Sequence, residues 1–140
     1  MFSALVAAAL AVVVIHAPKA DLHLEVAQNA AQRQHGLMDR SSLPQHTGMI
    51  FVFPQDGEVA FWMKRTLVPL DMVFVGSDGT VRSVFANVQT VAPNLPDGQI
   101  PIENGMAKYV IELPGGEAIQ DGIVTGTRLN VADIPAAAPN

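Results

Sequence analysis

The sequence predicts a mainly β fold, with about seven short antiparallel strands in a small barrel-like or two-layer meander and two short helices. Two observations lead to this prediction. Short apolar or alternating segments recur along the chain, separated by tight turns, and only two short segments carry helix signals. The chain has 140 residues, 49% of them hydrophobic, which suits a single globular domain.

The first twenty residues differ in composition from the rest. Residues 2–15 form an uninterrupted run of apolar and small residues, which is short for a membrane span but has the length of a signal-peptide core. We therefore predict a signal peptide over residues 1–20 and a periplasmic or secreted protein. The alternatives are an uncleaved apolar anchor, which would be the protein's only membrane contact, and a hydrophobic first helix packed on the domain. The absence of cysteine excludes disulfides and thiol catalysis.

Local signals are clear just after residue 20. Residues 21–27, DLHLEVA, alternate between apolar and polar side chains, which predicts a half-buried strand. Asn29 is a good N-cap for a helix that extends to about His35. Gln32 is the matching capping-box residue, and Gly36 marks the end of the helix.

The middle of the chain predicts two hairpins. Residues 49–53, MIFVF, form a solid apolar run and predict a strand buried on both faces. The sequence PQDG at residues 54–57 then predicts a turn into a second strand over residues 58–63. Pro69 has no N–H to donate, so it must lie at an edge or a bend. The second hairpin is predicted from residues 71–75 and 81–88 around the turn at residues 76–79.

The last third of the chain predicts a loop followed by short elements. Residues 90–105 are rich in Pro, Gly and Asn, which predicts a long loop that could flank a site. The further elements are a strand over residues 108–113, a helical turn over residues 117–121 ended by Gly122, and a final strand over residues 127–131. A single domain is thus predicted over residues 21–133, with a disordered tail over residues 134–140.

Several ordered blocks resemble a known family. They are GLM at residues 36–38 with Arg40, GMIFVF at 48–53, FWMK at 61–64, PLD at 69–71 and IELPGG at 111–116. Over about residues 22–131 the chain resembles the bacterial family named domain of unknown function 192. The resemblance implies a small β-rich domain, often behind a signal peptide, and it implies no reaction. The chain departs from the family pattern at Arg65, where Asn is usual, and after Val88, where many relatives have a cysteine.

The segment FWMKRTLVPLD, residues 61–71, carries the candidate binding residues. On a strand Trp62 and Lys64 point to the same face. If that face is open, an indole beside an ammonium group suits a sugar ring or a small polar anion, with Arg40 and Arg65 as further candidates. The alternative is that Trp62 belongs to the core and Lys64 only extends along the surface.

Two carboxyl groups are the weaker candidates for catalysis. Asp71 lies between apolar neighbours, so it needs a partner to stay ionised. It could cap backbone N–H groups, pair with Arg40, Lys64 or Arg65, or act as a general base. Glu112 could pair with Lys108, or join Asp71 in a two-carboxylate site for glycoside hydrolysis.

Composition argues against other classes of function. Lys and Arg total 8 against 13 for Asp and Glu, without a basic cluster, so nucleic-acid binding is not expected. No nucleophile elbow or phosphate loop is present. The histidines lack paired ligand spacing, so neither a metal nor another cofactor is predicted. We expect the methionines to fill the core: Met38, Met49, Met63, Met72 and Met106. The alternative is that their thioethers bind copper(I).

The sequence therefore favours a non-enzymatic, exported envelope domain. We expect it to bind a small polar ligand, a glycan or a protein partner at the face that carries Trp62, Lys64 and Arg40. The alternatives are a hydrolase that uses Asp71 and Glu112, and a structural accessory domain without a ligand.

Overall fold

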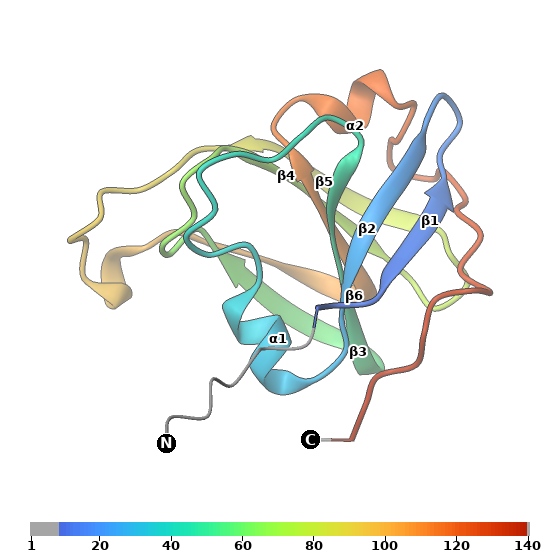
Figure 1. Cartoon of the computed structure of the whole chain (residues 1–140), viewed down its shortest axis with the longest axis horizontal. Coiled ribbons are helices and arrows are strands. Elements are labelled where there is room, and N and C mark those ends of the chain that lie inside the picture. The colour runs from blue at the N-terminus through green and yellow to red at the C-terminus, as the bar shows by residue number, and fades with distance from the viewer. Residues whose placement is uncertain (1–8, 140) are drawn as a thin grey trace, which may run out of the picture.

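The computed structural model describes residues 9–139 (Figure 1). Its strands are β1 (Val12–His16), β2 (Asp21–Ala27), β3 (Thr47–Trp62), β4 (Leu70–Val75), β5 (Val81–Val88) and β6 (Ile102–Pro114). Its helices are α1 (Ala30–His35) and α2 (Glu117–Gln120), with a 3₁₀ turn η1 (Asp97–Gln99). The fold is thus mainly β with two short helices, as predicted.

The six strands form one twisted mixed sheet in the order β1-β2-β3-β6-β4-β5. Strands β2 and β3 pair in parallel, whereas every other neighbouring pair is antiparallel. The prediction of antiparallel strands alone was therefore wrong for one pair. Since β1 and β5 are both edges, the sheet does not close into a barrel. In Figure 1 the two helices lie at opposite ends of the sheet, α2 at the top and α1 at the bottom.

Side chains alternate along the strands between two buried cores. The Leu24 core consists of Val13, Ile15, Leu22, Leu24, Val26, Ile50, Val52, Val73, Val75, Val81, Ile111, Leu113, Ala118, Ile123 and Leu129. The Phe51 core consists of Ala27, Leu37, Met49, Phe51, Met63, Leu70, Met72, Phe74, Ala107 and Val110. Central strands therefore contribute to both cores, which explains the solid apolar run predicted to be buried on both faces. Of the five methionines expected to fill the core, Met49, Met63 and Met72 lie in the Phe51 core, as gap-filling residues do. The expectation was wrong for Met106, which is 53% exposed.

The helix signals after β2 were correct in detail. The Asn29 side-chain oxygen accepts the Gln32 N–H at 2.8 Å, and the Gln32 side-chain oxygen accepts the Asn29 N–H at 3.3 Å. Gly36 ends the helix with a positive φ of 51°, and its N–H bonds the Gln32 carbonyl. The β4–β5 hairpin and the short helix α2 were also predicted correctly.

The predicted hairpin over residues 49–63 was wrong. β3 continues through the sequence PQDG as one strand paired with β6, and the register shifts between Val52 and Gly57. The shift leaves this segment as a bulge instead of a turn. Contacts distant in sequence hold it: Lys108 Nζ donates to the Phe53 carbonyl at 2.6 Å, and Arg82 forms two bonds with the Asp56 carboxylate at 2.6 and 2.8 Å.

The C-terminal third also differs from expectation. β6 starts at Ile102, so the loop before it is shorter than predicted and the strand is longer. The predicted strand over residues 127–131 contributes only one isolated bridge, between Thr80 and Arg128. The tail was predicted to be disordered from residue 134. In the structure it lies against the domain, since the Ala138 N–H bonds the Gln28 carbonyl and the Gln28 amide bonds the Ala136 carbonyl.

The N-terminal strand changes the predicted domain boundary. β1 pairs with β2 along its whole length, and its inward side chains Val13 and Ile15 belong to the Leu24 core. The sheet therefore begins inside the segment predicted as a signal peptide. Residues 1–8 of that segment lie outside the described residues, and export stays a prediction. Within residues 9–139 no helix is long and apolar enough to cross a membrane.

Replacing Ile15 with alanine tests whether β1 is part of the folded domain. Ile15 is buried, so we expect the Ile15→Ala variant to lose about 2 kcal/mol of unfolding free energy, the low end for a core isoleucine because β1 is an edge strand. Val14 is on the same strand but faces outward, so Val14→Ala is the control and should change stability little. Urea unfolding measures both. Equal, small effects would show that β1 is removed or unpaired in the purified protein.

Candidate functional site

A cavity of about 290 Å³ opens on the Phe51 side of the sheet. On one side it is bounded by α1 and the loop that follows α1, and on the other by the second half of β3. Its lining consists of Arg33, Gln34, His35, Gly36, Leu37, Met38, Phe51, Phe53, Ala60, Phe61, Trp62, Lys64, Thr66 and Glu112. We call it the Glu112 cavity. A backbone bond from the Asp39 N–H to the Arg65 carbonyl, at 2.8 Å, joins the two loops beside it.

Aromatic rings form much of the cavity wall. Phe61 packs edge-on against Phe51, with ring centres 4.9 Å apart, and against Phe53 at 6.1 Å. Arg33 lies 5.4 Å above the Phe53 ring, and its guanidinium donates to the carbonyl groups of Gln28 and Val52. These contacts hold the wall in place before any ligand binds, because each ring has a neighbour that restricts it.

Glu112 is the ionisable group that the sheet buries at this cavity. It lies on the central strand β6, directly opposite Met49 of β3 and Met72 of β4. Only 4% of the residue is exposed, and among residues 9–139 no hydrogen bond or charged partner offsets the desolvation of its carboxyl group. Burial raises the pKa of Glu112 to about 8. At neutral pH the group is therefore mainly protonated, and it offers one O–H donor and one carbonyl acceptor.

Gly48 allows β3 to approach β6 beside Glu112. A Cβ atom at position 48 would lie 1.9 Å from the Glu112 carbonyl oxygen, a distance that no side chain can adopt. The glycine in the family block GMIFVF thus has a steric reason. It keeps the strands close at the point where the carboxyl group enters the cavity.

The structure brings two of the predicted binding residues together. Trp62 is half-buried and Lys64 follows the end of β3, and both line the Glu112 cavity. Lys64 Nζ lies 5.3 Å from the centre of the Trp62 ring and 2.9 Å from the Asp97 carboxylate. Trp62 is therefore neither a core residue nor fully exposed, which resolves the alternatives left open by the sequence.

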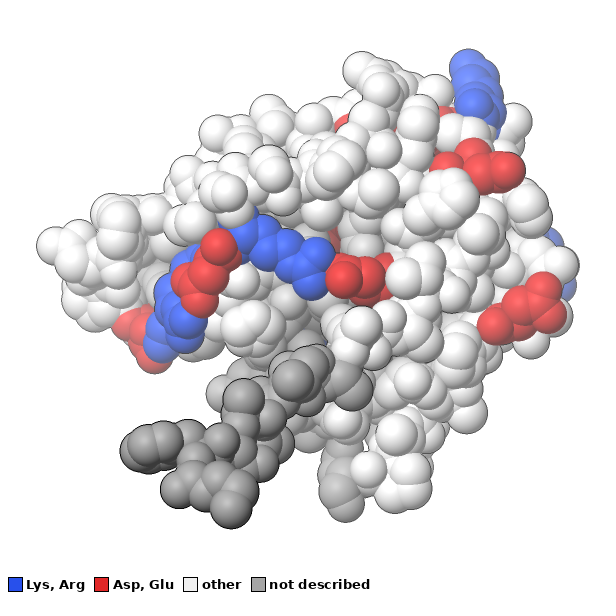
Figure 2. All heavy atoms as spheres, in the orientation of Figure 1, with Lys and Arg blue, Asp and Glu red and all other residues white. Residues whose placement is uncertain are grey.

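Arg40 and Arg65 do not line the cavity. Arg40 pairs with Glu25 of β2 at 2.5 Å, and Arg65 pairs with Asp39. Arg65 has a positive φ of 54°, a conformation in which Asn is favoured, so the residue usual in the family suits this backbone. Figure 2 shows blue and red side chains alternating across one face, so the charges there offset one another.

Asp71 ties backbone segments together. It is 1% exposed. One carboxylate oxygen accepts the N–H groups of Asn87 at 2.7 Å and Gly116 at 2.8 Å, and the other accepts the Ala118 N–H at 2.7 Å. The capping interpretation was thus correct, and pairing with Arg40, Lys64 or Arg65 was wrong. The residue joins β5, the turn after β6 and helix α2 to β4.

Asp71 and Glu112 do not share a site. Across the β4–β6 pair Asp71 is opposite Leu113, while Glu112 is opposite Met72. Residues directly opposite one another share a face of the sheet, and neighbours along a strand do not. The two carboxyl groups thus point to opposite faces, and the two-carboxylate hydrolase site was wrong. Lys108, the other suggested partner of Glu112, bonds the Phe53 and Pro54 carbonyl groups instead.

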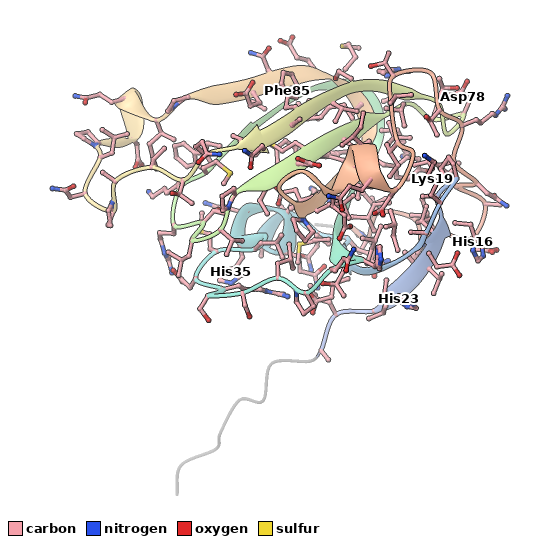
Figure 3. All side chains as sticks on the ribbon, turned by 90° about the horizontal axis from the view of Figure 1, so that it is seen from above. His16, Lys19, His23, His35, Asp78 and Phe85 are labelled. Carbon is pink, nitrogen blue, oxygen red and sulfur yellow. The ribbon has the colours of Figure 1, made fainter. Side chains whose placement is uncertain are left out.

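Three ionisable side chains that the sequence did not connect meet elsewhere. They are His46, Glu117 and Asp121, which we call the His46 cluster; one ligand atom from each lies within 4.8 Å of the others. Burial is the main reason that the pKa of Glu117 is raised, to about 7. The spacing of Glu117 and Asp121, four residues apart, was a signal for one helix face, but His46 is far away in sequence. In Figure 3 His16 and His23 lie near the β1–β2 end, well apart from His35.

Comparisons with known proteins agree with this architecture. The family model for domain of unknown function 192, described as an uncharacterised conserved region, matches residues 12–131. The chain belongs to this family. The match begins at the first residue of β1, in line with the structural boundary of the sheet. A search of curated proteins gave no match.

Two crystal structures share the fold of this family member. One is a protein from Sinorhizobium meliloti 1021 proposed to be a transcription regulator, with 32% identity, a TM-score of 0.78, and coverage of 89% of this chain and 96% of that one. The other is a protein of unknown function from Novosphingobium aromaticivorans DSM 12444, with 29% identity, a TM-score of 0.73, and 86% of each chain covered. Neither description names a ligand or a reaction.

Proposed function

We propose that this domain binds a small, uncharged polar ligand in the Glu112 cavity, without catalysis. One observation supports the proposal above the others: a buried carboxyl group, whose desolvation no partner within residues 9–139 offsets, faces a preformed space. A buried polar group left without a hydrogen bond costs about 1–3 kcal/mol, so natural folds rarely keep one without a reason. A ligand that pairs with the carboxyl group supplies that reason.

The chemistry of the cavity indicates the ligand class. A neutral carboxyl group donates one hydrogen bond and accepts another, so it matches a neighbouring donor and acceptor on the ligand. The Phe51, Phe61 and Trp62 rings favour a flat or ring-shaped body. A volume of about 290 Å³ is small for a ligand site and suits a single ring. A sugar residue, free or at the end of a glycan, and a cyclic amide both have these features.

The cavity does not favour an anion. Arg33 is held by two backbone carbonyl groups, and Lys64 is paired with the Asp97 carboxylate. Neither cation is therefore free to neutralise a bound negative charge, which would also meet Glu112 when it ionises. Of the ligands suggested by the sequence, a neutral polar ring remains favoured over a small anion.

Nucleic-acid binding is a different function, suggested by the description of the S. meliloti protein. No specific feature of this chain favours it. The net charge is −5, and Arg40, Lys64, Arg65 and Arg82 are each paired with a carboxylate. Phosphate binding needs clustered, available cations. We therefore propose a ligand-binding role instead of a regulator of transcription.

Export is a separate proposal that rests on the apolar residues 2–15. It would place the Glu112 cavity in the periplasm or outside the cell, where glycans and their fragments are accessible. Mass spectrometry of the N-terminus after expression in a bacterial host tests it. The cavity and its chemistry do not depend on the result.

Trp62 fluorescence provides the direct test of binding. Trp62 is the only tryptophan and lines the cavity, so a ligand that enters changes its emission. We expect a panel of monosaccharides and cyclic amides to contain a compound that gives a saturable change, and we expect its affinity to fall as the pH rises above about 8. The Glu112→Met variant should bind at least about tenfold more weakly, because an apolar side chain removes both hydrogen bonds.

Two control variants make the test specific. Glu112→Gln keeps a donor and an acceptor, so it should retain binding. Glu103→Met changes the same residue type on the same strand but at a different cavity, and it should bind as the wild type does. Unchanged affinity in Glu112→Met, or no response to any member of the panel, would contradict the proposed function and favour a structural accessory domain.

A further inference from the structure

We propose that the His46 cluster is a binding site for a divalent transition-metal ion, with zinc as the best match. The cluster combines one imidazole with two carboxylates. Imidazole nitrogen favours zinc and its neighbours in the first row over magnesium or calcium, and carboxylate oxygens complete such sites. None of the three residues lines the Glu112 cavity, so this proposal does not depend on the proposed function.

The fold positions the three side chains from two separate segments. His46 is the residue before β3, while Glu117 is the first residue of α2 and Asp121 follows its last residue. Residues four apart on a helical turn lie on the same face, so both carboxylates point toward the loop that carries His46. The His46 N–H also donates to a Glu117 carboxylate oxygen at 2.6 Å, which fixes the loop against the helix.

Buried atoms without partners are the independent indication of a ligand. Glu117 and Asp121 are 4% and 2% exposed. Within the described residues 9–139, one oxygen of each carboxylate, together with Nδ1 of His46, is buried and has no hydrogen-bond partner. Two carboxyl groups buried side by side cannot both ionise readily without a counter-ion. A divalent cation would neutralise the carboxylates and provide a partner for all three atoms.

The distances between the three ligand groups allow one ion to bind after small side-chain movements. His46 Nδ1 lies 3.4 Å from an Asp121 carboxylate oxygen and 3.9 Å from a Glu117 carboxylate oxygen. Zinc bonds of about 2.0–2.2 Å place two ligand atoms roughly 3–4 Å apart. The ligands therefore already have a spacing that one ion can bridge. The His46 side chain is 39% exposed, so the open side of the ion would face solvent there.

The test uses the full chain after removal of metals with a chelator. Titration calorimetry with zinc should show one site per chain, and saturating zinc should raise the melting temperature by roughly 5–10 °C. Magnesium and calcium should bind much more weakly. Cobalt should produce a visible absorption band with the intensity of a four- or five-coordinate nitrogen and oxygen site, a readout that a purely structural role would not give.

Three substitutions assign the site. His46→Asn suits the positive φ of 63° at this position, so it removes the imidazole without adding backbone strain. His46→Asn and Glu117→Gln, each as a single variant, should weaken zinc binding about tenfold or more and abolish the cobalt band. His23→Asn is the control, because His23 is an exposed histidine on the adjoining strand β2 and should be neutral.

Two results would overturn the metal site. The first is zinc binding that is absent, or unchanged in His46→Asn. The second is a metal-free protein in which the two carboxyl groups share a proton, seen as a stability that depends on pH but not on zinc. Either outcome would leave the Glu112 cavity and its proposed ligand unaffected.

Discussion

Replacing Asp71 with alanine is expected to destabilise the protein by about 3–5 kcal/mol. The carboxylate accepts three backbone N–H groups, from Asn87, Gly116 and Ala118, and the residue is 1% exposed. Without it these three donors have no acceptor and water cannot easily reach them. The ends of β5 and β6 and the start of α2 would then lose their common anchor on β4. Urea unfolding, followed by Trp62 fluorescence and circular dichroism, measures the loss.

Asp78 offers a matched control for Asp71. It is an exposed aspartate in the β4–β5 turn that accepts the Thr80 N–H at 2.9 Å, so Asp78→Ala should cost about 1 kcal/mol or less. Asp71→Asn should be intermediate, because it keeps one acceptor oxygen and turns an NH₂ group toward a donor. If the unfolding free energy of Asp71→Ala lies within about 1 kcal/mol of the wild-type value, the capping role is wrong.

The stability of the wild-type protein should fall as the pH rises from about 4.5 to about 8, through the titration of Glu112. In the folded state its pKa is about 8, against an ordinary value of 4.5 for an exposed glutamate. Between these values the folded chain binds more protons at this site than the unfolded chain does. Stability therefore decreases with increasing pH, and the total loss once the pH exceeds about 8 is on the order of 5 kcal/mol.

Glu112→Gln isolates this contribution. Glutamine cannot ionise, so its unfolding free energy should not carry the Glu112 part of the pH dependence. Other groups, including Glu117, titrate in both proteins and cancel in the difference. The variant should match the wild type near pH 4 and be more stable at pH 9. Chemical unfolding at several pH values measures this difference, and two parallel curves would show that Glu112 is solvated or paired in solution.

The same titration links stability to the proposed ligand. Below pH 8 the cavity presents a neutral group that donates and accepts, while above it the group becomes a charge that the aromatic wall does not stabilise. A neutral ligand should then stabilise the folded protein most at neutral pH. Binding and stability measured on the same pH scale would show whether one ionisation governs both.

Much of the local structure was readable from short-range signals. The ends of α1 are capped by residues that lie only three or four positions apart: Asn29, Gln32 and Gly36. The alternation of residues 21–27 matches β2. The β4–β5 hairpin follows from its turn sequence. In each case the interacting groups are neighbours along the chain, so their pattern already contains the geometry.

The errors arose where distant residues overruled a local signal. The sequence PQDG is a good turn, yet Lys108 and Arg82 hold it extended as a bulge in β3. The apolar start was predicted as an export segment, and part of it, Val12–His16, pairs with β2 as a strand. A run of fewer than twenty apolar residues is compatible with both roles, so export stays a prediction.

Some features of the candidate site were predictable from the sequence, and others depend on the tertiary structure. The sequence by itself determined a mainly β domain of a recognisable family, because strand alternation is a property of the backbone. It also named Trp62 and Lys64 as neighbours, although Lys64 lies in the turn after β3 and not on the strand. Only the tertiary structure decided that Asp71 is a backbone cap, that Glu112 faces a cavity on the opposite side, and that His46 meets Glu117 and Asp121. Burial and the pairing of strands distant in sequence set the surroundings of a carboxyl group, and its surroundings determine its chemistry.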